Sequence, residues 1–224
     1  IMITASHNEY QDNGVKIVDY NGQMIDSESE SIIENYINDK EKIDKYIEIL
    51  TPKKIFIGCD SRLSCNEIKS ELIKGIRSIS EKVTIIDYDK VTTPQHHYLV
   101  SINSNDKDDY IEKFKNLDML NINTSNIMID CANGIGYWPI FNLKYIHNLN
   151  YEIINMDINK YSLLNNKCGS DHVISNNDVP NYFNNNYLGC SLDGDADRFI
   201  FYYFDDKLNL LDGDYISVLY LLFI

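Results

Sequence analysis

Two short polar stretches of this 224-residue chain carry residue types that could do chemistry. The first is IMITASHNEY, residues 1–10, in which Ser6 and His7 follow a short apolar run. Ser6 and Glu9 have the S-x-x-E spacing of a helix capping box, but the turn formers in residues 10–14 leave that cap no helix. His7 is unsuited as the base for Ser6, because adjacent side chains of an extended segment point to opposite faces. The feature to explain is a hydroxyl at a strand end.

The second stretch is SLDGDADRF, residues 191–199, in which Asp193, Asp195 and Asp197 alternate with other residues. Residues two apart in an extended backbone share one side, so the three carboxylates can converge there. Gly194 allows the backbone to turn tightly enough to aim them inward. Because carboxylate oxygens are the ligands that hard cations prefer, this spacing predicts a Mg²⁺ site.

Three alternatives to a Mg²⁺ site arise from the same residues. An EF-hand calcium loop needs Gly at its sixth position and Glu at its twelfth, where this chain has Arg198 and Phe204. A solvated acidic turn is disfavoured, because like charges this close repel unless a cation or Arg198 offsets them. A phosphatase of the haloacid dehalogenase type also begins with D-x-D after a strand. In that case Asp193 would be the nucleophile, and this alternative stays open.

The elements around the two stretches predict an α/β fold, built as two consecutive mixed, mostly parallel α/β domains, because short β-branched runs alternate with helical patterns. We expect strands at residues 1–4, 54–58, 83–87, 126–131, 151–156 and 188–192. We expect helices at 27–38, 64–79, 111–120, 136–146 and from 214 onward, and one arm of a hairpin at 199–204.

A domain boundary is expected at the polar stretch 101–109, which carries turn formers and charge without an apolar period. This places one domain at 1–108, with the serine stretch, and a second at 109–224, with the acidic stretch. The chemistry would then lie where the two domains meet.

The overall composition limits the class of partner. The chain has 20 Lys and Arg against 34 Asp and Glu, a net charge of −14, which argues against nucleic acid because phosphates would be repelled. The apolar run 215–224 is too short to span a bilayer, so no membrane association is expected. The five cysteines form no C-x-x-C pair, so they suggest neither disulfides nor a zinc site; they are Cys59, Cys65, Cys131, Cys168 and Cys190. We therefore predict a cytoplasmic protein.

TASHN and DGDADR together resemble the α-D-phosphohexomutase superfamily. Further stretches agree with the resemblance, which covers essentially the whole chain: DNGVK (12–16), GCDSR (58–62), TTPQHHY (92–98), DCANGIG (130–136) and LLNNKCGSDHV (163–173). In phosphoglucomutase and phosphomannomutase relatives the G-x-D-x-R strand precedes the serine loop, whereas here it follows the loop. That order resembles the phosphoacetylglucosamine mutase family.

The resemblance implies domains of phosphohexomutase type and a phosphosugar substrate. Such enzymes interconvert N-acetylglucosamine 6-phosphate and 1-phosphate, on the way to UDP-N-acetylglucosamine. A phosphoserine gives its phosphoryl group to the sugar, the resulting 1,6-bisphosphate turns over in the site, and the other phosphate returns to the serine. Glucose 1,6-bisphosphate or N-acetylglucosamine 1,6-bisphosphate is then the activator or intermediate, and the oligomeric state is left undetermined.

The resemblance also assigns roles to individual residues of this chain. Ser6 matches the phosphoryl carrier, and together with the three aspartates of the acidic stretch it would hold a single Mg²⁺. Arg198 matches the arginine beside the transferring group, and Lys16 matches the basic residue that assists proton transfer at the sugar hydroxyl. His7 is expected as a polar contact beside the serine. Asp60 and Arg62 are expected in the wall of the site, without a defined role, while four other histidines are expected to be structural: His96, His97, His147 and His172.

Departures from the family pattern set further expectations. Glu9 stands where relatives usually have Pro, and Cys59 where they commonly have Arg. The G-T-A-G-F-R segment expected upstream and the sugar-reading and phosphate-clamping loops expected downstream are not in the sequence. We therefore expect residues 1–224 to be a piece that is inactive alone, with apolar surface exposed at Leu219, Leu221 and Phe223. Another phosphohexomutase and a non-catalytic remnant remain alternatives.

Overall fold

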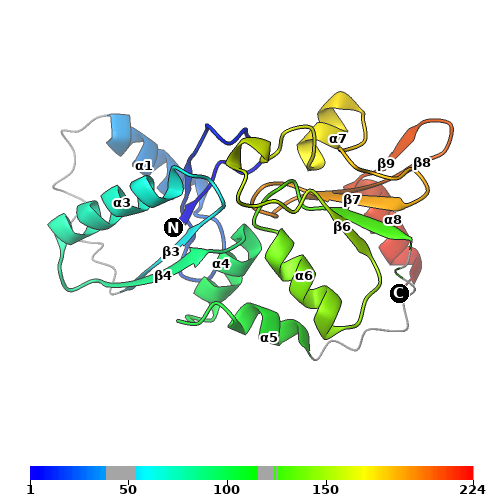
Figure 1. Ribbon diagram of the computed structural model, residues 1–224. Helices are drawn as coiled ribbons and strands as arrows, with labels where there is room; N and C mark the ends of the chain where they lie inside the picture. Colours follow the sequence, from blue (N-terminus) through cyan, green and yellow to red (C-terminus); the bar gives the residue numbers. More distant parts are fainter. Residues whose placement is uncertain (39–53, 116–123, 125, 224) are drawn as a thin grey trace.

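The computed structural model describes residues 1–38, 54–115, 124 and 126–223, and arranges them as two α/β units that each have their own sheet (Figure 1). The mixed α/β class predicted from the sequence is confirmed. The stretch 101–109 runs from the end of the last helix of the first unit to the helix that leads into the second. The precise domain limits, 1–108 and 109–224, stay a prediction.

The first unit is a sheet in the order β2-β1-β3-β4, in which only the β1–β2 pairing is antiparallel. Helix α3 packs against Ile3 and Ile57 on one face, and α4 brings Leu99 against Met2 on the other. Burial of both faces explains why β3 is a nearly continuous apolar run. The elements are β1 (Met2–Ile3), β2 (Val15–Lys16), α1 (Ser27–Asn38), β3 (Lys54–Cys59), α3 (Cys65–Ile79), β4 (Thr84–Lys90) and α4 (Thr93–Ser101).

The second unit is a sheet in the order β6-β5-β7-β8-β9. Helix α6 covers the face that carries Ile129 and Tyr151, and the segment of α7 covers the face that carries Ile200 and Tyr202. The remaining elements are α5 (Asp109–Lys115), β5 (Ile127–Asp130), α6 (Tyr137–Ile146), β6 (Glu152–Ile154), the short 3₁₀ helix η2 (Tyr161–Leu163), α7 (Ser170–Asn176), β7 (Leu188–Leu192), β8 (Phe199–Phe204), β9 (Leu208–Leu211) and α8 (Gly213–Phe223).

The predicted strands are all present: β1, β5 and β6 are shorter than expected, β3 and β4 are longer, and β7 has the expected limits. The hairpin is confirmed, since β8 pairs antiparallel with β9. The expectation of mostly parallel sheets holds for the first unit, but in the second the β7–β8 and β8–β9 pairings are antiparallel and only the other two are parallel. The helix predicted at 111–120 begins earlier, at Asp109, and its predicted residues 116–120 lie outside the described residues.

Five of the described elements were not predicted: β2, α4, η2, α7 and β9. The missed helix α4 matters most, because it starts beside the site. Thr92 and Gln95 form a capping box at its N-terminus, with Gln95 N donating to Thr92 Oγ1 (3.2 Å) and Thr92 N donating to Gln95 Oε1 (2.9 Å). The T-x-x-Q spacing and the proline after Thr93 were visible in the sequence as helix-start signals.

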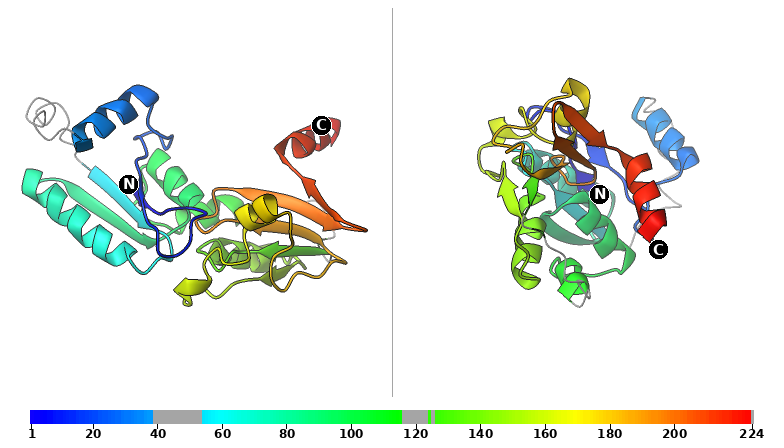
Figure 2. Two further views of the ribbon diagram at one scale, coloured as in Figure 1. Left: turned by 90° about the horizontal axis from the view of Figure 1, so that it is seen from above. Right: turned by 90° about the vertical axis from the view of Figure 1, so that its right-hand side faces the viewer.

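The arrangement of the two sheets positions the chemistry. The serine stretch follows the carboxyl end of β1, and the acidic stretch follows the carboxyl end of β7. Ligands of parallel α/β sheets bind outside the carboxyl ends of the strands. Figure 2 shows the segment after β1 reaching across to the second unit, so these two carboxyl ends face each other.

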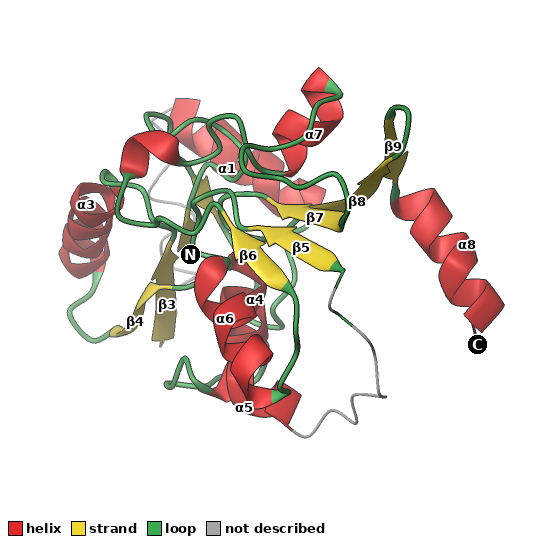
Figure 3. Cartoon of the chain, turned by 45° about the vertical axis from the view of Figure 1, so that its right-hand side comes forward, coloured by secondary structure: helices red, strands yellow, loops and turns green. Residues whose placement is uncertain are grey.

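The remaining sequence expectations concern thiols and apolar segments. All five cysteines are free and buried. No helix among the described residues is both long and apolar enough to cross a bilayer. Helix α8 stands beyond the β8–β9 hairpin (Figure 3), and Leu219 and Leu221 are exposed there as expected. The side chain of Phe223 lies outside the described part of the structure.

Candidate active site

The serine loop, which we define as residues 4–8, is a tight turn at the end of β1. Thr4 leaves the strand, and its hydroxyl accepts a hydrogen bond from Ser6 N (2.9 Å). Asn8 N closes the turn on Ala5 O (3.0 Å). Ser6 has a φ of 51°, in the left-handed region that residues other than glycine seldom occupy. Backbone strain of this kind persists only where the surroundings enforce it, and it concentrates at functional sites.

The metal loop, which we define as residues 193–198, turns between β7 and β8. Asp193 closes it, because Asp193 Oδ1 accepts hydrogen bonds from the backbone N of Asp197 (3.1 Å) and of Arg198 (3.2 Å). Gly194 is required for close approach: a Cβ there would lie 2.8 Å from Ser6 O. The metal loop therefore packs directly against the serine loop.

Three carboxylates meet in the metal loop, as the alternating spacing predicted. Asp193, Asp195 and Asp197 each offer an oxygen, and the three oxygens lie within 4.8 Å of one another. The side chains of Asp193 and Asp195 are 1% and 0% exposed. Asp195 Oδ1 is buried and has no hydrogen-bond partner within the described residues. An orphaned buried carboxylate oxygen in an all-oxygen cluster fits a hard divalent cation such as Mg²⁺.

The two buried carboxyls, Asp193 and Asp195, differ in pKa because their surroundings differ. Burial, together with the neighbouring charge of Asp195, raises the pKa of Asp193 to about 6. Burial also acts to raise the pKa of Asp195, but the Lys16 ammonium and the Thr93 hydroxyl outweigh it and hold this pKa below its usual range. Asp195 is the carboxylate that stays ionised most firmly.

Two cations border the cluster. Lys16 lies on β2, beside β1, and its Nζ is 2.7 Å from Asp195 Oδ2 and 2.6 Å from Asp197 Oδ2. Burial would lower the Lys16 pKa, but these two carboxylates raise it above its usual value. Arg198 Nη2 is 3.1 Å from Asp193 Oδ2 and 3.3 Å from Ser6 Oγ. Three carboxylates facing two cations leave the site with a net negative charge.

Ser6 completes this constellation. Its hydroxyl donates to Asp193 Oδ2 at 2.7 Å and lies 3.4 Å from Asp197 Oδ1. The structure thus brings together six of the seven site residues predicted from the sequence: Ser6, Lys16, Asp193, Asp195, Asp197 and Arg198. The seventh, His7, is exposed, and its side chain makes no hydrogen bond with any residue that the structure describes.

Asp60 and Arg62 lie buried under the serine loop, where Arg62 contacts the loop backbone, and their place in the wall of the site stays a prediction. Both side chains are 0% exposed and form an ion pair. Thr4 Oγ1 donates to Asp60 Oδ2 (2.8 Å), and Arg62 Nη2 donates to Ser6 O (3.2 Å). A buried arginine needs acceptors for its donors, and the loop carbonyls provide them.

Two residues of the site were missed by sequence reasoning. Thr93 starts α4 and donates from Oγ1 to Asp195 Oδ2 at 2.6 Å, and its backbone N donates to Asp195 O at 3.0 Å. Asn165 donates from Nδ2 to Ser6 O at 2.9 Å. Both belong to stretches noted in the sequence, TTPQHHY and LLNNKCGSDHV, but nothing local to those stretches indicates either contact. The four histidines expected to be structural make no hydrogen bond to the metal loop: His96, His97, His147 and His172.

Comparison with known proteins places this geometry in a family context. Residues 1–44 match the family model described as phosphoglucomutase/phosphomannomutase, alpha/beta/alpha domain I. Phosphoacetylglucosamine mutase 1 of Schizosaccharomyces pombe is 37% identical over 250 residues, covering 97% of this chain and 48% of the relative. The chain thus spans about half the length of the curated relatives it matches.

Solved structures of the α-D-phosphohexomutase superfamily share the fold. Aspergillus fumigatus N-acetylphosphoglucosamine mutase in complex with GlcNAc-6P and magnesium is 30% identical, with a TM-score of 0.81 over 97% of this chain and 46% of that one. A variant of the same enzyme in complex with glucose 1,6-bisphosphate is 29% identical, with a TM-score of 0.86 over 99% of this chain and 47% of that one.

Proposed function

We propose, from the homology of the chain to the phosphoacetylglucosamine mutases, that it supplies the phosphoryl-transfer elements of such a mutase. The reaction would interconvert N-acetylglucosamine 6-phosphate and N-acetylglucosamine 1-phosphate, in the cytoplasm, on the route to UDP-N-acetylglucosamine. The observation that carries the proposal is the 2.7 Å contact that joins Ser6 Oγ to the three-carboxylate cluster. Ligands of the structural neighbours, GlcNAc-6P and glucose 1,6-bisphosphate, support a sugar phosphate substrate and a bisphosphate intermediate.

Ser6 is the carrier in this mechanism. With a phosphoryl group on Ser6 Oγ, the P–O bond to the serine breaks as a P–O bond to the free sugar hydroxyl forms. The serine oxygen gains one proton and the sugar hydroxyl loses one, an exchange that we assign to Lys16. The 1,6-bisphosphate then returns its other phosphoryl group to Ser6. Arg198, 3.3 Å from Ser6 Oγ, provides positive charge and a donor where the equatorial oxygens of the transferring group would lie.

Asp193, Asp195 and Asp197, with Ser6 Oγ, would hold one Mg²⁺ per chain. A bound Mg²⁺ neutralises the charge that develops on the transferring group. The protein prepares this site by leaving Asp195 Oδ1 without a hydrogen bond and by spacing the three oxygens within 4.8 Å. A Mg²⁺ held by the aspartates, together with the neighbouring Lys16 and Arg198, would thus allow an acidic chain to bind an anionic substrate.

Lys16 is suited to carry the proton. Its raised pKa means that it is protonated at neutral pH, and its Nζ is fixed between two carboxylate oxygens. In this arrangement the ammonium can give a proton to the serine or sugar oxygen that leaves, and only the neutral amine formed by that step can take the proton of the hydroxyl that attacks. General acid–base groups of this kind contribute ~10²–10⁴-fold to the rate.

The phosphatase alternative requires Asp193 as the nucleophile, and the geometry disfavours it. Asp193 is 1% exposed, its Oδ1 accepts two backbone hydrogen bonds, and its Oδ2 is covered by Ser6 and Arg198. Ser6 is the more accessible of the two residues. A phosphoryl group entering the site would meet the hydroxyl before the carboxylate.

Phosphopeptide mapping tests the proposal. The intact protein is incubated with glucose 1,6-bisphosphate and Mg²⁺, digested and sequenced by mass spectrometry, alongside Ser6→Ala and the exposed serine control Ser162→Ala. We expect phosphate on Ser6 in the wild type and in Ser162→Ala, stable to hydroxylamine, and none in Ser6→Ala. Phosphate on Asp193, which hydroxylamine would remove as an acyl phosphate, would overturn the mutase assignment in favour of the phosphatase.

Substrate choice is tested with the same protein. We expect kcat/KM for N-acetylglucosamine 6-phosphate to exceed that for glucose 6-phosphate or mannose 6-phosphate. A preference for either of the other sugars would assign the chain to another phosphohexomutase. Mg²⁺ binding without phosphorylation or turnover would leave the non-catalytic remnant as the explanation.

A further inference from the structure

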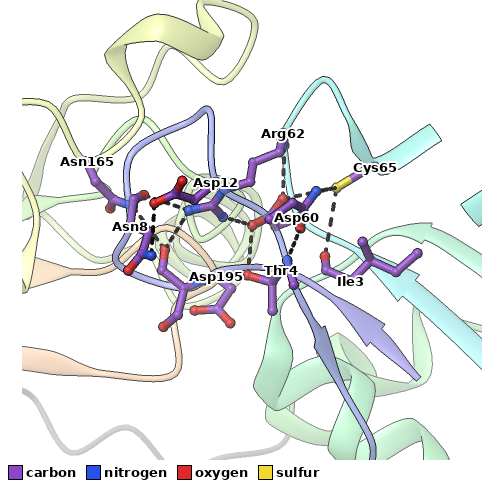
Figure 4. A network of polar contacts seen from close by, with 12 residues as sticks. Ile3, Thr4, Asn8, Asp12, Asp60, Arg62, Cys65, Asn165 and Asp195 are labelled. Atoms are coloured by element: carbon purple, nitrogen blue, oxygen red, sulfur yellow. Dashed lines mark hydrogen bonds and ion pairs between the residues drawn. The ribbon is translucent and has the colours of Figure 1, made fainter. Parts of the chain in front are cut away.

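Two side chains from different units hold the backbone of the serine loop (Figure 4). Arg62 Nη2 donates to Ser6 O at 3.2 Å and to Asn8 O at 2.6 Å. Asn165 Nδ2 donates to the same two carbonyls, at 2.9 Å each. Arg62 belongs to the first unit and is buried beside Asp60, whereas Asn165 belongs to the second unit. The loop is therefore clamped from both sides.

Asn165 is itself fixed in place. Its φ is 56°, a left-handed conformation that asparagine tolerates better than most residues, and its backbone N donates to Ala132 O at 3.0 Å. Its side chain fills the gap beside the metal loop, since a Cβ on Gly194 would lie 3.0 Å from Asn165 Nδ2. The carboxamide is thus wedged between the serine loop and the metal loop.

This placement couples the two halves of the site. Both donors of one amide group are used on carbonyls two residues apart, which supports the left-handed turn at Ser6. The same turn sets the 2.7 Å contact between Ser6 Oγ and Asp193. If the carboxamide is removed, Arg62 of the first unit still donates to the loop carbonyls. Among the described residues of the second unit, no other side chain donates to these carbonyls.

We infer that Asn165 is a positioning residue that holds the serine loop in register with the metal loop for phosphoryl transfer. The inference rests on the proposed mutase function. Asn165 makes no hydrogen bond to Ser6 Oγ or to the described carboxylates, so it takes no part in bond making. Its effect reaches the reaction through the position of Ser6, and a misplacement of about 1 Å can cost ~10²-fold in rate.

Two substitutions separate the donor from the backbone geometry. Asn165→Gly removes the carboxamide and keeps the left-handed conformation available, and Asn165→Asp keeps the shape but replaces the donor by an acceptor. The same two changes at Asn148 serve as matched controls, because Asn148 is an exposed asparagine with a φ of 49°. All four variants are made in the intact protein, and kcat, KM, Mg²⁺ affinity and the thermal unfolding midpoint are measured.

We expect both Asn165 variants to lose about 10- to 100-fold in kcat, with KM and Mg²⁺ affinity within about twofold of wild type and the fold retained. Both Asn148 variants should behave as wild type. Wild-type kcat in Asn165→Gly and Asn165→Asp would overturn the inference. So would losses of Mg²⁺ affinity or folding that parallel the loss of activity in both variants, since they would assign Asn165 a purely structural role. A wild-type protein without mutase activity would instead refute the proposed function.

Discussion

Replacing Asp195 with asparagine keeps the shape of the side chain but removes one charge from the cluster. The side chain is 0% exposed, and its Oδ2 accepts from Lys16 Nζ at 2.7 Å and from Thr93 Oγ1 at 2.6 Å. Its Oδ1 is the orphaned oxygen. The variant can keep the contacts of one side-chain oxygen, while the other position becomes an uncharged group that binds Mg²⁺ poorly.

The metal-free fold should tolerate this change. The carboxylate oxygens lie within 4.8 Å of one another, so each ionised pair repels by at least about 3.5 kcal/mol at an effective dielectric constant of about 20, and Asp195 takes part in two of the three pairs. The variant relieves that repulsion but loses the attraction to Lys16, which is 23% exposed and hence partly screened by solvent. The two effects oppose each other, so we expect the free energy of unfolding without Mg²⁺ to change by less than about 2 kcal/mol.

The Mg²⁺-dependent properties should change strongly. Loss of one of three carboxylate ligands should weaken binding at least ~100-fold, which is about 2.7 kcal/mol. The wild type at ~100 times its Kd gains about the same 2.7 kcal/mol of stability from the ion, and the variant should gain little at that concentration. Turnover should fall by ~10²–10³-fold or more, because charge on the transferring group loses its compensation.

Thermal unfolding of the intact protein without Mg²⁺ measures the stability of the metal-free fold, and the shift on adding Mg²⁺ measures the stabilisation by the ion. The matched control is Asp206→Asn, which removes the same charge from the exposed turn between β8 and β9. An Asp195→Asn protein with a wild-type Mg²⁺-induced shift would refute the metal assignment. A collapse of the metal-free fold would refute the balance of charges argued above.

The other predictions use the same site. Burial and a neighbouring carboxylate raise the pKa of Asp193 to about 6, and this group must lose its proton to bind a cation. Mg²⁺ affinity should therefore be constant above about pH 7 and fall about tenfold per pH unit well below 6, and calorimetric titration that finds no such fall would contradict it. Lys16→Gln should lower kcat at least ~100-fold without weakening Mg²⁺ binding, because the ammonium competes for the same oxygens; weaker binding would show that Lys16 orders the ligands instead. Gly194→Ala should cost ~1–3 kcal/mol in denaturant unfolding because its Cβ would lie 2.8 Å from Ser6 O, whereas Gly75→Ala, in helix α3 with nothing within 4 Å, should gain ~0.5–1 kcal/mol. Equal effects of the two glycine changes would mean that the loops do not touch.

Local sequence pattern was sufficient to predict most of the strands and helices, and the chemistry within the metal loop. Apolar β-branched runs identified β3 and β5, because strands buried on both faces need such residues. The alternation of aspartates predicted convergence of their carboxylates, and the three oxygens do lie within 4.8 Å. Both inferences depend only on backbone periodicity, which neighbouring residues determine.

Local pattern failed where polar residues are buried for the sake of the site. Helix α4 was missed because it buries Thr93, Gln95 and His96 along with Leu99 and Val100, so it lacks the single apolar face by which a surface helix is recognised. Helix α7 and strand β2 are too short to show a period. In each case tertiary contacts, rather than an amphipathic pattern, stabilise the element.

The contacts that assemble the site were decided by the packing of the two units. Ser6 and Asp193 are 187 positions apart, and Asn165 and Ser6 are 159 apart. No periodicity relates residues at such separations. The serine loop meets the metal loop because the carboxyl ends of β1 and β7 face each other, and the same packing buries Arg62 beneath the loop and leaves His7 in solvent. Residue types set what each loop can do, and only the packed fold determines which donor lies within 3 Å of which acceptor.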